Sequence, residues 1–300
     1  MPPRLPDLFI VGAPKCGTTA LTRYLEGHPQ VFMAGRKDLH HFGSDLQMRH
    51  RPCADRAAYL QHFAGAGPAH LRLGDSSVWY LYSQRAAAEI AAFNPQARPI
   101  ILLREPVSMM YALWGQLRYN SVHDEDIDDF ALAMAAEADR AAGRRLPPRT
   151  PLPEGLLYRR VASFAEQVDR YFRAFGRERV LVLLQDDLKT DAEGTWGRVL
   201  DFLGLDRGFT PSLDAVNTAK EVRSPALRQL LAAVPDPLKA LLPEGLRAST
   251  RRLLRKANSR HAERQPLDPA LAARLRAEMA GEVDRLEALL GRDLSRWRSG

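Results

Sequence analysis

The sequence has few cysteines and no long apolar run. Cys16 and Cys53 are the only cysteines among 300 residues, which excludes a disulfide framework and favours a reducing compartment. No run of about 18 apolar residues occurs, so no membrane span is expected. The N-terminal MPPRLPD also lacks the apolar stretch of a signal peptide. These absences predict a soluble, cytoplasmic protein.

The chain also lacks internal repeats and a long Gly/Ser linker. Its composition, 45% hydrophobic and 26% charged, is that of a globular protein with a sizeable core. We therefore expect a single domain over residues 1–300, with a core at about 8–224 and a helical C-terminal part at about 225–300.

Acidic groups do not balance the basic ones, and the net charge is +7. This excess favours an acidic ligand such as a nucleotide. The densest basic stretch, residues 247–264, has no interleaved aromatic residues that could stack on bases. A solvated helix face is therefore the preferred interpretation of this stretch, and a nucleic-acid partner is not expected.

Residues 8–21, LFIVGAPKCGTTAL, combine an apolar run, a glycine-bracketed loop and a helix start. Gly12 and Gly17 allow the backbone to turn its N–H groups inward, and the helix opened by Thr18 and Thr19 favours an anion at its N-terminus. The spacing nearly matches the Walker A pattern, but Thr18 stands where a nucleoside triphosphatase needs lysine. Lys15, inside the loop, is the nearby lysine. A ligand with a 5′-phosphate and another transferable group fits better than a magnesium triphosphate.

Apolar runs that predict buried strands alternate with helical patterns along the chain. The strands are expected at residues 9–11, 31–33, 71–75, 98–103 and 178–184, and helices at 83–93, from 106 onward and at 161–175. The alternation predicts an α/β, P-loop-like three-layer fold with a central parallel sheet flanked by helices. The Pro-rich residues 143–158 are expected to form a surface loop. A C-terminal helix should pack one apolar face on the core, formed by Leu271, Leu275, Met279, Val283, Leu286 and Leu290.

The segments FIVGAPKCGTTALTRYLEGHPQVF, RKDLHHF, RPIILLREPVSMMYALWGQLRYN and FAEQVDRYFRAFGRERVLVLLQDDL occur in this order. Together they resemble sulfotransferases that use 3′-phosphoadenosine-5′-phosphosulfate (PAPS), in the branch of bacterial sulfotransferases and the heparan N-sulfotransferase domain. The resemblance runs from about residue 8 to about residue 224. It implies transfer of a sulfuryl group from PAPS to a hydroxyl or amine, without a metal ion.

The resemblance also implies roles for individual residues in donor binding. Lys15 would be the catalytic cation on the leaving 5′-phosphate. The family's 3′-phosphate arginine corresponds to Arg104, but its serine eight residues later is replaced by Ala112. Ser108, one helical turn earlier, is the candidate to take its place, and whether it does so stays open. The other expected donor contacts are Cys16, Gly17, Thr18, Thr19, Lys220 and Arg223.

The acceptor side of the site has two candidates for the base. Asp38 aligns with the family's glutamate, although its side chain is shorter, and His41 is the alternative because its ordinary pKa suits proton abstraction at neutral pH. Lys37 would orient the sulfonate or keep Asp38 ionised. Further acceptor contacts are expected from Asp75, Ser76 and Trp79.

Two other functions remain open at this point. Asp186 and Asp187, which follow an apolar run, could imitate the Walker B acid of a P-loop small-molecule kinase. A basic nucleotide-binding or nucleic-acid-binding module without turnover would follow if Ala112 marks a lost donor site. The acceptor itself stays open, because carbohydrate, lipid, peptide and secondary-metabolite acceptors all occur on this scaffold.

Overall fold

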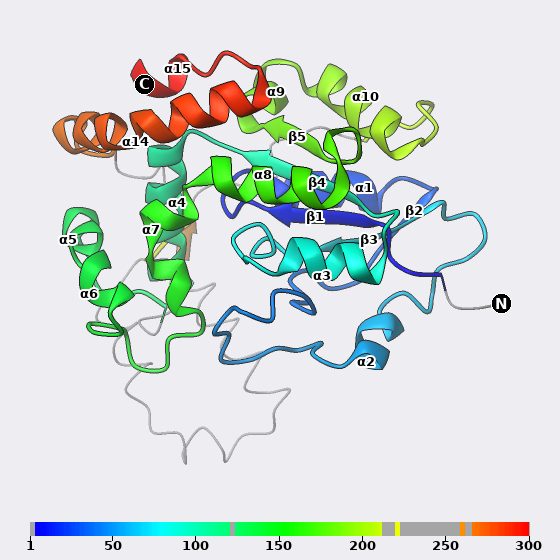
Figure 1. The fold of residues 1–300 in the computed structure, drawn as a ribbon, viewed down its shortest axis with the longest axis horizontal. Helices are drawn as coiled ribbons and strands as arrows, with labels where there is room; N and C mark the ends of the chain where they lie inside the picture. Colours follow the sequence, from blue (N-terminus) through cyan, green and yellow to red (C-terminus); the bar gives the residue numbers. More distant parts are fainter. Residues whose placement is uncertain (1–3, 121–123, 212–219, 223–258, 262–265, 300) are drawn as a thin grey trace.

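The computed structural model describes residues 4–120, 124–211, 220–222, 259–261 and 266–299. A five-stranded sheet with the strand order β2-β3-β1-β4-β5 forms its centre (Figure 1). Every neighbouring pair in this sheet is parallel. The strands are β1 (Leu8–Gly12), β2 (Val31–Met33), β3 (Arg72–Ser76), β4 (Arg98–Leu103) and β5 (Leu181–Leu184). The predicted α/β fold with a central parallel sheet is confirmed.

Strand β1 lies in the middle of the sheet, between β3 and β4. Its residues Leu8, Phe9, Ile10 and Val11 are fully buried. A central parallel strand is covered on both faces, which is why β1 is an unbroken apolar run rather than an alternating one.

Helices cover both faces of the sheet. In Figure 1, α3 (Ala86–Phe93) and α8 (Phe164–Phe175) cross in front of it, and α1 (Thr18–Glu26) lies behind it. The buried side of α8 repeats every three to four residues, through Phe164, Val168, Tyr171 and Phe175. The remaining helices up to residue 211 are α2 (Arg56–Gln61), α4 (Pro106–Asn120), α5 (Phe130–Ala135), α6 (Glu137–Ala141), α7 (Tyr158–Val161), α9 (Gln185–Thr190) and α10 (Ala192–Leu203).

Three predicted boundaries shift for local reasons. Helix α3 starts at Ala86 rather than at residue 83, and the Ser83 hydroxyl accepts the Ala86 N–H at 2.9 Å just before it. The helix expected over residues 161–175 is two helices, α7 and α8, that meet at residues 162–163. The strand expected from residue 178 begins at Leu181, because residues Arg177–Arg179 form a 3-10 turn.

The surface loop expected over residues 143–158 is wrong for its last part. Residues Pro153–Leu156 form a 3-10 turn, and Leu156 and Tyr158 are fully buried. The Tyr158 hydroxyl donates to Glu125, which also pairs with Arg140. These contacts anchor the segment in the core, whereas its prolines alone predict an exposed loop.

The C-terminal helix α14 (Pro269–Leu290) packs against α8 and α4, followed by the short α15 (Arg296–Ser299). The Asp268 carboxylate caps it by accepting the Leu271 N–H at 2.7 Å. The apolar face expected from the sequence is confirmed, with Leu275, Met279, Val283 and Leu286 buried. Within the described part of the chain, β6 (Lys220–Val222) and β7 (Ser259–His261) form a separate antiparallel pair. No helix in this part has the length and apolar character needed to cross a bilayer.

Replacing Leu275 by alanine tests whether α14 and the sheet form one cooperative unit. The Leu275 side chain is 0% exposed, so its truncation should lower the free energy of unfolding by about 2–5 kcal/mol. Urea unfolding should show this loss in one transition. Leu132→Ala is the control, because the Leu132 side chain is 60% exposed and its removal should change stability by less than about 0.5 kcal/mol. A separate transition for α14 would contradict the single-domain prediction.

Candidate functional site

The loop between β1 and α1 lies at the carboxyl edge of the sheet. Its first glycine has no room for a side chain, because a Cβ on Gly12 would lie 2.5 Å from the Cβ of Leu81. Gly17 has φ +100°, a conformation that favours glycine, and it directly precedes α1. The Ala13 N–H donates to the Leu102 carbonyl at 2.7 Å and so fixes the loop to β4. The first N–H groups of α1 have no acceptor within the helix, so this loop can bind an anion.

Two lysines lie beside this loop. The Lys15 ammonium donates to the Gln116 side-chain oxygen of α4 at 3.0 Å. The Lys37 ammonium donates to the Thr19 hydroxyl at 3.1 Å. Burial lowers the pKa of Lys37, and the neighbouring Asp38 opposes that shift. Both cations are therefore oriented by side chains and placed around the same helix start.

Asp38 is fixed at the end of β3 by backbone contacts. Its N–H donates to the Ser76 carbonyl at 2.9 Å, and its carboxylate accepts the Val78 N–H at 3.3 Å. Its φ of +59° allows both contacts at once. The structure therefore places Asp38 and Lys37 at the sheet edge that also carries the phosphate loop.

The two adjacent histidines have different surroundings. His41 stacks on Tyr59 with ring centroids 4.3 Å apart, and its Nδ1 lies 2.7 Å from the Cys53 carbonyl. His40 has a buried Nδ1 without a hydrogen-bond partner among the described residues. Burial lowers the pKa of His40, and Asp38 opposes this effect. His40, which the sequence does not single out, is thus electrostatically linked to Asp38, whereas His41 belongs to an aromatic cluster.

Asp75 is a buried structural carboxyl and not an exposed acceptor contact. It accepts hydrogen bonds from the hydroxyls of Ser77, Tyr80 and Tyr59, at 2.8, 3.0 and 3.1 Å. Burial raises its pKa to about 6, and these three hydrogen bonds oppose the shift. The side chain is 0% exposed, so the expectation that Asp75 grips an acceptor directly is corrected.

Ser76 and Trp79 differ in their access to a substrate. Ser76 is buried, and its hydroxyl accepts the Thr22 hydroxyl at 2.8 Å, so it too is a structural contact. Trp79 is half-buried, and its ring packs against Gly155, where a Cβ would lie 3.2 Å away. Of the acceptor contacts expected in this segment, Trp79 has the accessible side chain.

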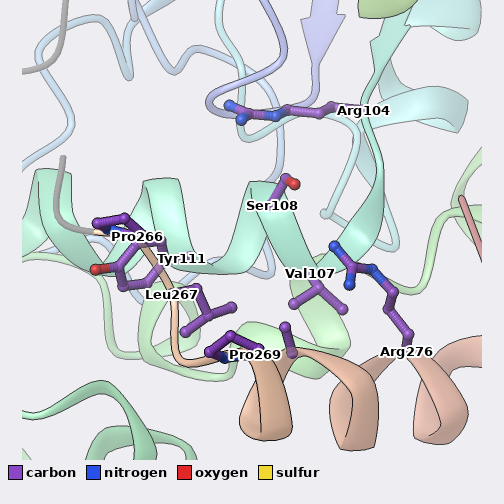
Figure 2. A pocket seen from close by; sticks show the side chains of 9 residues that line it. Arg104, Val107, Ser108, Tyr111, Pro266, Leu267, Pro269 and Arg276 are labelled. Atoms are coloured by element: carbon purple, nitrogen blue, oxygen red, sulfur yellow. The ribbon is translucent and has the colours of Figure 1, made fainter. Parts of the chain in front are cut away.

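A cavity of about 470 Å³ opens beside the first turns of α4. Figure 2 shows the Ser108 hydroxyl directed toward the side chain of Arg104, which follows β4. Glu105 caps α4 by accepting the N–H groups of Val107 and Ser108 at 3.1 and 2.6 Å. Ala112 is buried. The structure thus brings Arg104 and Ser108 to one cavity, as the substitution of Ser108 for the missing serine requires.

Residues 6–211 match the model of the sulfotransferase family. The chain belongs to the sulfotransferase family. The chain is similar over nearly its whole length to the crystal structure of a sulfotransferase from Alicyclobacillus acidocaldarius. The TM-score is 0.72 and the identity 27%, over 98% of this chain and 99% of the other.

Curated relatives include the heparan sulfate glucosamine 3-O-sulfotransferase 6 of Mus musculus, 27% identical over 72% of this chain. The human bifunctional heparan sulfate N-deacetylase/N-sulfotransferase 1 is 25% identical over 67% of this chain. The matches cover 57% of the first relative and 22% of the second. The chain thus spans about half the length of the first and a smaller share of the second.

The acidic pair after β5, Asp186 and Asp187, has a structural role. Asp187 accepts two hydrogen bonds from Arg292 at 2.8 and 2.9 Å and one from Arg198 at 3.0 Å. These contacts lower the pKa of Asp187 to about 2, against the opposing effect of burial. Asp186 accepts the Trp297 indole N–H at 3.0 Å. The pair therefore fastens the C-terminal segment to α9, and two arginines occupy the Asp187 carboxylate.

Cys16 is a packing residue of the phosphate loop. Burial raises the pKa of its thiol to about 12, although Arg104 and Lys15 oppose the shift. A thiol in this state is a poor nucleophile at neutral pH. Lys220 opens β6, of which the backbone is described, and Arg223 lies outside the described residues. The basic stretch 247–264 also lies outside them, apart from the backbone of β7.

Sequence reasoning misses Arg276, which reaches the Arg104 cavity from α14. Its Nε lies 3.6 Å from a Glu105 carboxylate oxygen. In the sequence, Arg276 is marked only by its position next to Leu275, a residue of the predicted apolar face. The elements against which this helix packs are known only from the structure.

The raised pKa of Asp75 predicts a pH-dependent stability. Its ordinary value is 3.8 and its value in the folded protein is about 6. Between these values the folded protein holds a proton that the unfolded chain has lost, so stability falls as pH rises through this window and levels off above it. The free energy of unfolding of the wild type, minus that of Asp75→Asn, should fall by on the order of 3 kcal/mol from about pH 4 to about pH 7. Urea unfolding measures both proteins, and a difference independent of pH would contradict the assignment.

Proposed function

We propose that the protein transfers a sulfuryl group from PAPS to a hydroxyl or an amine. The observation that carries this proposal is the phosphate loop, which has Lys15 inside it and Thr18 at the Walker lysine position, next to the cavity of Arg104 and Ser108. Membership of the sulfotransferase family supports the reaction class. Relatives named as 3-O- and N-sulfotransferases support acceptance by oxygen or nitrogen.

In the proposed donor site the loop binds the 5′-phosphosulfate. Amides at Gly17, Thr18 and Thr19 and the two threonine hydroxyls hold the phosphate, while Lys15 stabilises the negative charge that develops on its bridging oxygen. Gln116 fixes the Lys15 ammonium before the donor arrives. Arg104 and Ser108 bind the 3′-phosphate, which distinguishes this donor from ADP-like nucleotides.

The proposed transfer is an in-line displacement. The acceptor oxygen or nitrogen forms a bond to sulfur as the bond from sulfur to the bridging oxygen breaks, and the acceptor proton passes to Asp38. Lys37 lies beside Asp38, and its ammonium, which donates to the Thr19 hydroxyl, orients the sulfonate. Asp38 is preferred to His41 because the His41 ring is held by Tyr59 and the Cys53 carbonyl. Trp79 provides an apolar surface for the acceptor.

Calorimetric titration with 3′-phosphoadenosine-5′-phosphate (PAP), ADP and magnesium ATP tests the donor assignment. We expect PAP to bind at least about tenfold more tightly than ADP, because charge-assisted contacts from Arg104 and Ser108 are made only with the 3′-phosphate. Tighter binding of magnesium ATP would favour the kinase alternative. Binding of PAP no stronger than ADP would contradict the proposal.

Lys15→Ala should lower the rate of sulfuryl transfer by at least about a hundredfold, because it removes the cation at the leaving oxygen. PAP release from PAPS in the presence of an acceptor found by screening measures this rate. Lys189→Ala is the matched control, since that lysine is 62% exposed and pairs with Asp186. An unchanged rate in folded Lys15→Ala protein would show that the cation is supplied elsewhere.

A further inference from the structure

We propose that Arg276 of the C-terminal helix is a second arginine for the 3′-phosphate of the donor nucleotide, opposite Arg104. This inference rests on the proposed function and adds a residue outside the stretch that matches the family, residues 6–211. It assigns part of donor recognition to α14, a helix whose other role is to pack its apolar face against the core.

The position of Arg276 brings it to the donor cavity. Helix α14 packs against α4, and Arg276 lines the same cavity as Arg104 and Ser108. In Figure 2 its side chain extends from α14 toward α4, with Ser108 and Arg104 above it in the view. Residues from two helices far apart in the sequence thus converge on one space.

The cavity offers two kinds of surface. Its cationic and hydroxyl groups come from Arg104, Arg276 and Ser108, and the remaining lining is apolar or aromatic. That lining consists of Val107, Tyr111, Pro266, Leu267, Pro269 and Ala272. A phosphate ester attached to a flat, weakly polar ring system matches this division, because the phosphate needs charged donors and the ring needs apolar contacts. The adenosine 3′-phosphate part of the donor has this chemistry.

The contact between Arg276 and Glu105 leaves the guanidinium able to bind an anion. The distance from Nε to the Glu105 carboxylate is 3.6 Å, longer than a hydrogen bond, and Nε is buried without a hydrogen-bond partner among the described residues. The Glu105 oxygens already accept the N–H groups of Val107 and Ser108. Glu105 therefore holds Arg276 near α4, and a phosphate oxygen would supply a stronger acceptor.

This arrangement also accounts for Ala112. The serine of the family pattern is replaced there by a buried alanine, so that turn of α4 offers no hydroxyl to the 3′-phosphate. Arg276 approaches the first turn of the same helix from α14 and supplies a charged donor in addition to the Ser108 hydroxyl. A planar guanidinium can bind two phosphate oxygens at once, which one hydroxyl cannot.

Titration of the full chain with PAP and with adenosine 5′-monophosphate (AMP) tests this role. Arg276→Gln should weaken PAP at least about tenfold and AMP less than about twofold, because AMP lacks the 3′-phosphate. Arg276→Lys should keep part of the preference for PAP, since it retains the charge but not the planar group. Arg274→Gln is the matched control on the same helix, because Arg274 is 65% exposed and pairs with Glu278, and it should bind both nucleotides like the wild type.

Each outcome separates this inference from the proposed function. If the wild type prefers PAP and Arg276→Gln keeps that preference, the role of Arg276 is overturned and the donor assignment stands. Equal weakening of PAP and AMP would show that Arg276 only holds α14 on α4, and would also overturn it. If the wild type shows no preference for PAP, the proposed function itself fails. If Arg276→Gln does not fold, Arg276→Lys provides the test. A preference for PAP as strong as that of the wild type in Arg276→Lys would overturn the role of the Arg276 guanidinium.

Discussion

The burial of β1 between two parallel neighbours is the constraint on which the rest of the structure depends. Because β1 pairs with β3 and β4, the chain segments that leave all three strands emerge at one edge of the sheet. The phosphate loop follows β1, Asp38 is fixed to the end of β3, and Arg104 follows β4. Backbone bonds from Ala13 to β4 and from Asp38 to β3 couple the positions of these groups to the sheet register. A shift of β1 would therefore displace the loop and the groups around it together.

The positively charged side chains of this protein have two roles, which their contacts distinguish. Arg292 binds Asp187 through both carboxylate oxygens, and Arg140 does the same with the buried Glu125. Such bidentate pairs neutralise each other and fasten elements together. Around the phosphate loop, Lys15 and Lys37 instead donate to an amide oxygen and a hydroxyl. These contacts orient both ammonium groups beside the loop, where an anionic ligand would meet positive charge.

The sequence predicts best the features that depend on neighbouring residues. The apolar β1 run, the loop bounded by Gly12 and Gly17 and the apolar face of α14 all have periodicities or spacings that mark them, and the parallel sheet follows from the alternation of strands with helices. Arg104 and Ser108 line one cavity because Arg104 directly follows β4 and Ser108 lies in the first turn of α4.

Features that need tertiary contacts escape the sequence. The position of Asp75 at a strand end suggests a ligand-binding acid. In the structure, however, it accepts hydrogen bonds from Tyr59 and Tyr80, which both lie outside β3. His41 and His40 are adjacent in the chain, yet the Tyr59 ring and the Cys53 carbonyl contact only His41. Arg276 becomes a cavity residue only when α14 docks on α4.

A crystal structure of the protein with PAP bound tests the central claim most directly, namely that the edge above β1 and β4 is a donor-nucleotide site. The account predicts the 5′-phosphate within hydrogen-bond distance of the backbone at residues 17–19 and of Lys15, with the 3′-phosphate against Arg104. PAP bound away from this edge, or with its two phosphates exchanged, would contradict it.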